Sequence, residues 1–82
     1  MIEVQVRFFA QAREATGCAA ATHEIPERAS VAEVAGILGA AYPALAPHLG
    51  RCAFAVNEGY ARREDRLNAG DELAVIPPIG GG

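Results

Sequence analysis

The chain has 82 residues, which is the size of one small domain. Hydrophobic residues make up 51% of it, but 18 of them are alanines, so the larger apolar side chains suffice for one modest core. Because a domain this short buries only about 60% of the surface of its unfolded chain, we expect no enclosed active site with walls of its own. We expect any chemistry to take place at an edge of the domain or together with a partner.

The charge pattern argues against a nucleic-acid partner. Seven arginines and no lysine face ten acidic residues, which gives a net charge of −3. The densest basic spot, Arg62-Arg63, is followed directly by Glu64-Asp65, so its field largely cancels. Binding a phosphate backbone needs clustered cations. The missing lysines also exclude Schiff-base chemistry on this chain.

Cysteine, histidine and apolar patterns exclude further classes. Cys18 and Cys52 are too few for a disulfide framework, and together with His23 and His48 they stand at no metal-ligand spacing, so we expect no bound metal and solvated histidines. The apolar runs are too short to span a membrane. The start, MIEVQV, lacks the cationic segment of a secretory signal. These features predict a cytoplasmic protein without membrane contact.

The first part of the chain predicts a hairpin. Residues 2–9 alternate between apolar and polar side chains, as a half-buried strand does, and this alternation places Phe9 on the polar face. Residues 10–17 are typical of a short helical turn that stops at Gly17. Residues 19–25 form a weaker strand pattern, and we expect this strand to pair back on the first.

The clearest helix is predicted for residues 30–42. Ser30 and Glu33 have the spacing of a capping box, in which each side chain satisfies a free backbone amide of the other residue. Pro43 prevents the helix from continuing. One apolar stripe recurs at helical spacing: Val31, Val34, Leu38 and Tyr42, with Ile37 beside it.

The last part of the chain predicts three short strands. Residues 52–56 form the first and place Cys52 in the core, and residues 60–62 return from a turn. Residues 72–76 form the last strand, whose parity turns Ile76 away from the core.

The order of elements is therefore β-β-α-β-β, an α+β fold with one main helix packed on a mixed sheet of four to five strands. Residues 1–76 form this domain and residues 77–82 an extended, flexible tail.

The tail, PPIGGG, is the most informative segment. Extended, residues 77–82 reach about 20 Å, and residues without side chains can thread a channel too narrow for a Cβ. The carboxylate at Gly82, with a pKa of about 3.3–3.7, is a poor electrophile that must be activated before a nucleophile can attack it. The chain has no P-loop. We therefore expect it to bind no cofactor and another protein to consume ATP in activating Gly82.

Three segments carry a family resemblance. FFAQAREATG (residues 8–17), GDELAVIPP (residues 70–78) and the terminal Gly81-Gly82 together resemble the small, sulfur-carrier subunit of molybdopterin synthase. The resemblance implies the ubiquitin-like β-grasp fold. It also implies that an E1-like enzyme adenylates Gly82, which is then converted to a thiocarboxylate. The chain departs from that family at Gly80, where a bulkier or polar residue often precedes the two glycines; we expect the same chemistry.

The same resemblance implies a partner and a contact surface. The partner is the large synthase subunit, in a heterotetramer, into which the tail inserts to donate sulfur to cyclic pyranopterin monophosphate. This chain is then the sulfur-donating cosubstrate and is not catalytic alone. The implied partner-binding residues are three large side chains and the tail: Phe9, Tyr60, Ile76, Pro77, Pro78, Ile79 and Gly80.

Three alternatives remain open. A carrier of the thiamine-synthesis type shares the activated tail, but such carriers are typically shorter and lack the FFAQARE stretch. A ubiquitin-like modifier would join Gly82 to lysines of target proteins, so that only the acceptor separates it from a sulfur carrier. A plain β-grasp binding module would keep its function without Gly81 and Gly82, whereas every carrier would lose its own.

Overall fold

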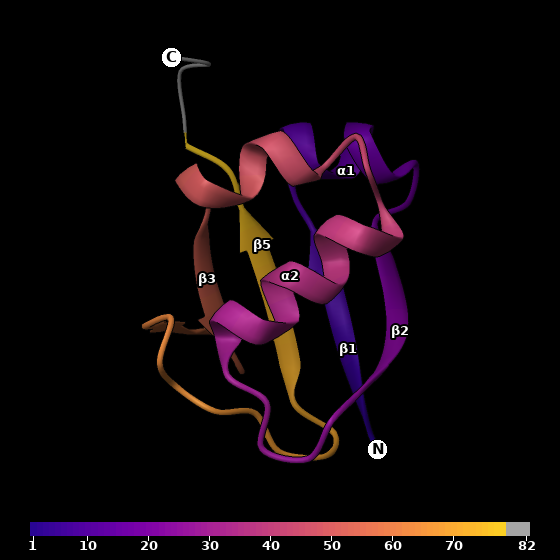
Figure 1. Cartoon of the computed structure of the whole chain (residues 1–82). Helices are drawn as coiled ribbons and strands as arrows, with labels where there is room; N and C mark the ends of the chain where they lie inside the picture. Colours follow the sequence, from indigo (N-terminus) through magenta and orange to yellow (C-terminus); the bar gives the residue numbers. More distant parts are fainter. Residues whose placement is uncertain (79–82) are drawn as a thin grey trace.

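A computed structural model describes residues 1–78 and shows a five-stranded sheet with one long helix lying across one face (Figure 1). The strands are β1 (Ile2–Phe8), β2 (Ala20–Ile25), β3 (Ala53–Val56), β4 (Gly59–Ala61) and β5 (Glu72–Ile76). Their order is β2-β1-β5-β3-β4, with β1 and β5 parallel and all other pairs antiparallel. The helices are α1 (Ala10–Thr16), α2 (Val31–Ala41) and the 3₁₀ helix η1 (Ala46–Arg51). The predicted mixed sheet and main helix are confirmed, whereas η1 was not predicted.

The predicted hairpin is confirmed, but its first strand ends one residue early. Val4, Val6 and Phe8 are buried, and β2 pairs antiparallel with β1. Phe9 lies outside the strand because its carbonyl accepts the N–H groups that open α1, and Ala10 turns the chain with a φ of +47°. The predicted strand over residues 2–9 is therefore wrong at its last residue. A helix begins at this point, so β1 ends at Phe8.

Gly17 ends α1 as predicted. It adopts the left-handed conformation, with a φ of +77°, and its N–H donates to the carbonyl of Arg13 at 2.9 Å. Glycine reaches this conformation without the steric cost that a Cβ adds. The stop at Gly17 lets the chain reverse into β2.

The capping box at the start of α2 is present with both of its hydrogen bonds. The Glu33 N–H donates to Ser30 Oγ at 3.1 Å, and the Ser30 N–H donates to Glu33 Oε1 at 2.9 Å. Arg66 lies 3.7 Å from the same carboxylate. The core-facing stripe of the helix is buried at Val31, Val34, Ala35 and Leu38, with Ile37 and Tyr42 partly buried. Serine at this position contributes about 1 kcal/mol to helix stability.

The Glu33 carboxylate makes unfolding dependent on pH. The Glu33 carboxylate accepts hydrogen bonds from the Ser30 backbone N–H and, with a smaller effect, from the Ser30 hydroxyl. Together with the charge of Arg66 they hold the pKa of Glu33 below its ordinary value of 4.5. A lowered folded-state pKa stabilises the fold above the unfolded-state pKa, and this contribution is lost as the pH falls through the folded-state value. Between about pH 5 and pH 3, wild-type Tm should therefore fall more steeply than that of Glu33→Gln, which keeps a capping box without titrating.

Thermal unfolding followed by circular dichroism across this range tests the prediction. Glu64→Gln, which neutralises another exposed acid away from the helix, is the matched control and should follow the wild-type curve. Parallel curves for wild type and Glu33→Gln would contradict it.

The core lies between α2 and the sheet. Its largest fully buried side chains are Phe8, Ile25, Leu38, Leu45, Leu67 and Leu73, joined by the valines of β1, α2 and β5. Cys52 belongs to this core as predicted: it is 7% exposed, its Sγ donates to the His48 carbonyl at 3.3 Å, and burial raises the pKa of its thiol. Within residues 1–78, every helix is too short or too polar to cross a membrane.

The expected solvation of His23 is wrong. His23 is half-buried on β2, with its Nε2 2.8 Å from the Tyr42 hydroxyl, and the two rings meet edge to face. Tyr42 also packs edge to face on Phe8. This contact ties the end of α2 to the edge of the sheet. His48 is exposed as expected.

Candidate functional site

The face of the sheet opposite α2 carries a continuous apolar surface. The strand register aligns Ala74 with Ala55 and Ala55 with Tyr60, and Ala53 with Ile76 in the neighbouring row. Paired residues point to the same side of a sheet. We call this surface the outer apolar face and define it by Phe9, Ala53, Ala55, Tyr60, Ala74 and Ile76.

Phe9 joins the outer apolar face from the end of β1. Its N–H donates to the Val75 carbonyl at 3.2 Å, which places it beside the last residues of β5. The guanidinium of Arg7, another residue of that side of the sheet, lies 5.1 Å from the centre of the Phe9 ring. Arg7 also lies 3.9 Å from Glu72. The apolar surface is thus bordered by a charged pair.

Phe9 and Ile76, which strand parity predicted to leave the core, do so, and the structure brings them to one face with Tyr60, which the family resemblance had suggested. Tyr60 is 83% exposed and Phe9 38% exposed, whereas Ile76 is half-buried between them. The three alanines that separate these side chains were not predicted. No local pattern marks these alanines, since alanine is unremarkable on either face of a strand, and only the strand register places them here.

The tail begins at the same end of the sheet as α1 (Figure 1). Pro77, predicted to belong to a flexible tail, is buried, and Pro78 is exposed. The remaining predicted tail residues, Ile79, Gly80, Gly81 and Gly82, lie outside the described residues. The part of the tail that leaves the domain therefore starts after Pro77.

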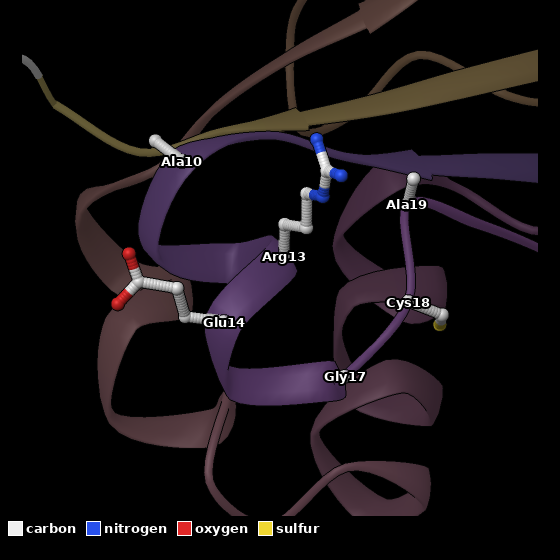
Figure 2. A pocket seen from close by; sticks show the side chains of 6 residues that line it. All are labelled: Ala10, Arg13, Glu14, Gly17, Cys18 and Ala19. Atoms are coloured by element: carbon white, nitrogen blue, oxygen red, sulfur yellow. The ribbon is translucent and has the colours of Figure 1, made fainter.

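A shallow hollow of about 560 Å³ lies beside α1 and is lined by Ala10, Arg13, Glu14, Gly17, Cys18 and Ala19. Figure 2 shows Arg13 and Glu14 extending from α1, while the Cys18 side chain points away from them. Among residues 1–78, no ion pair engages either Arg13 or Glu14. The Cys18 Sγ lies 3.7 Å from the Thr16 hydroxyl.

The described residues contain no candidate metal site, because no three His, Cys, Asp or Glu side chains come together among residues 1–78. What the fold presents instead is an apolar face beside the base of a tail that ends in glycines. These features suit a protein that docks on a partner and delivers its own terminus to it.

The mixed five-stranded sheet with a helix across one face defines a ubiquitin-like β-grasp domain. Residues 6–82 match the ThiS family, and the chain belongs to that family. It is 37% identical over 83 residues to the molybdopterin synthase sulfur carrier subunit of Chlamydomonas reinhardtii, covering 99% of this chain and 100% of that relative.

Solved structures show the same fold. The small archaeal modifier protein 1 of Methanosarcina acetivorans superposes with a TM-score of 0.85 at 28% identity, covering 100% of this chain and 98% of the other. A chain in the protein–protein complex of subunits 1 and 2 of the molybdopterin-converting factor from Helicobacter pylori superposes with a TM-score of 0.71 at 27% identity. That match covers 99% of this chain and 100% of the other.

Proposed function

We propose that this chain is the sulfur-carrier subunit of a molybdopterin synthase. The observation that carries the proposal is the match, over nearly the whole of both chains, to a molybdopterin synthase sulfur carrier subunit. Two further features support it. The chain ends in Gly81-Gly82, and the base of this tail adjoins an apolar face that can hold a partner.

The carrier reaction begins at the terminal carboxylate. An E1-like partner joins the Gly82 carboxylate to the AMP part of ATP, and pyrophosphate leaves. A sulfur nucleophile at the oxidation level of sulfide then attacks the acyl carbon and displaces AMP, which leaves a thiocarboxylate. This chain supplies the carboxylate and binds no cofactor of its own, so the partner consumes the ATP. We propose that the reaction takes place in the cytoplasm, where ATP is available.

Sulfur transfer takes place in the large synthase subunit. The thiocarboxylate sulfur attacks a carbon of cyclic pyranopterin monophosphate and replaces an oxygen substituent, which leaves that carbon. Water then cleaves the bond between that sulfur and the acyl carbon. Because a dithiolene holds two sulfur atoms, two thiocarboxylated chains are consumed for each pterin. Sulfur stays on the pterin, and the Gly82 carboxylate is restored. The large subunit contacts the outer apolar face and surrounds the tail. The two subunits form a heterotetramer.

A second candidate function is protein modification, favoured by the likeness to an archaeal modifier protein. It shares the adenylated Gly82 and differs in the acceptor, which would be a lysine amine of another protein. The chain has no lysine, so it cannot form lysine-linked chains of itself. A carrier of the thiamine type shares the thiocarboxylate and differs in the enzyme that receives its sulfur.

Mass spectrometry of the intact chain and its fragments tests the proposal. After incubation with ATP, an E1-like enzyme and a sulfur source, we expect an ATP-dependent exchange of oxygen for sulfur at Gly82. Fragmentation is needed because oxidation of Met1 or a cysteine adds nearly the same mass. Addition of the large subunit and the pterin precursor should return Gly82 to a carboxylate and yield a dithiolene product.

Other outcomes separate the alternatives. A thiocarboxylate that the large synthase subunit does not consume would favour the thiamine-type carrier. Conjugates through Gly82 to lysines of other proteins, without pterin product, would favour the modifier. An unmodified Gly82, under conditions that convert a known carrier, would refute the carrier functions together.

A further inference from the structure

The inward-facing side of β5 continues past the end of the strand. Leu73 and Val75 are fully buried, and Pro77, two residues further on, is buried as well, whereas Pro78 is exposed. This period of two is the strand repeat. Continuing the antiparallel register of β3 and β5 by one residue places buried Cys52 opposite Pro77. Pro77 therefore belongs to the packed domain although it follows the last paired residue.

A proline fits this position because the ladder on its β1 side has ended. The Val75 carbonyl accepts the Phe9 N–H, so the backbone N–H and C=O of Val75 face β1. Because these directions alternate along a strand, the backbone of residue 77 faces β1 as well. At that point β1 has ended and Ala10 has turned the chain into α1. The missing N–H of Pro77 therefore costs no ladder hydrogen bond.

Two consecutive prolines also fix the direction of the chain. Each ring holds its own φ near −65°. Ile76 and Pro77 each precede a proline, which confines both residues to the extended region. Ile76 and Pro77 thus hold extended backbone, and the chain leaves β5 from a root that is packed into the domain.

We infer that Pro77 is a positioning residue for the sulfur transfer: its buried ring anchors the root of the tail, so that residues 78–82 alone carry Gly82 to its acceptor. The inference rests on the proposed function. Five extended residues reach about 17 Å, so the reacting carbon stays within this distance of Pro77. A short tether of matched length raises the local concentration of the group that it carries.

The test compares Pro77→Ser with Pro26→Ser, a substitution at an exposed proline outside the tail. The two substitutions make the same chemical change, namely loss of one ring and gain of one hydroxyl and one N–H, but only the first removes a buried anchor. Thiocarboxylated chains prepared by sulfide cleavage of an intein fusion avoid the activation step. The rate of transfer at saturating large subunit and the Kd for that subunit are measured separately, well below the Tm of each variant.

Pro77→Ser should lower the saturated transfer rate about tenfold, because a released root no longer holds the reacting carbon near its acceptor. Its Kd should stay within about twofold of wild type, because the outer apolar face is intact. Pro26→Ser should leave both within about twofold, because Pro26 is exposed, follows β2 and lies outside the tail and the outer apolar face. Pro77→Val, which restores an apolar, strand-forming side chain, should recover most of the rate.

Equal effects of the two serine variants would overturn the inference, and so would a change confined to Kd. If Pro77→Ser does not fold, a slow transfer by a folded Pro77→Val would overturn it too, because burial would then not be the cause. These outcomes presuppose transfer by the wild type. A wild-type chain that transfers no sulfur refutes the proposed function itself.

Discussion

A chain without Gly81 and Gly82 is expected to bind the large synthase subunit and to transfer no sulfur. The deletion removes about 7 Å of reach and leaves the outer apolar face, through which we expect docking, unchanged. Glycine has no side chain to bury, so the Kd should rise by no more than about tenfold. Transfer should fall by at least about a thousandfold, because the new terminal carboxylate cannot reach the substrate or the activating site.

Two measurements check this expectation. Isothermal titration with the large subunit gives the Kd, and single-turnover formation of the dithiolene product gives the rate. The truncated chain should also inhibit wild-type transfer by competing for the docking site. Gly80→Ala, which keeps the length of the tail, is the control for a general disturbance of this segment. Sulfur transfer by the truncated chain would contradict the carrier role of Gly82 and favour an inert tail.

The elements predicted correctly are those whose signals are local in the sequence. The capping box of Ser30 and Glu33 joins residues three positions apart, and Gly17 ends α1 through a bond to Arg13. The alternation along β1 likewise depends on near neighbours. Such patterns can be recognised in the sequence because the residues that form the pattern also form the contacts that it predicts.

Features that depend on distant contacts could not be predicted. The parallel pairing of β1 with β5 joins Gln5 to Glu72, and no local pattern specifies that partner. The same pairing keeps Phe9 beside the end of β5 after it has left the strand, because its N–H donates to the Val75 carbonyl. The burial of Pro77 is a third case, because a proline after a strand looks the same in sequence whether or not other elements cover it.

The large side chains of the outer apolar face were predicted to bind a partner, whereas its alanines were not predicted. Phe9 and Ile76 were conspicuous because strand parity placed large apolar side chains on the polar side, and the family resemblance added Tyr60. Ala53, Ala55 and Ala74 carried no such signal, since an alanine on either face of a strand is unremarkable. Only the register shows that these alanines lie between the larger side chains.

Tyr60→Ala is expected to raise the Kd for the large subunit about thirtyfold, which corresponds to about 2 kcal/mol. The Tyr60 side chain is 83% exposed, so its removal leaves the packing of the core unchanged and the Tm should stay near that of wild type. The small alanines beside it let apolar side chains of the partner lie against the ring of Tyr60, which they would bury on both sides. Aromatic anchors of this kind carry a large share of interface energy.

Thr22→Ala provides the matched control for Tyr60→Ala. Thr22 is also exposed and lies on the same side of the sheet, but on β2, where its hydroxyl accepts a hydrogen bond from Gln5 at 2.8 Å. Its substitution should change the Kd by less than about twofold. Titration calorimetry of both variants decides the matter. If Tyr60→Ala and wild type bind with equal affinity, the large subunit does not cover Tyr60. The interface would then lie away from β4.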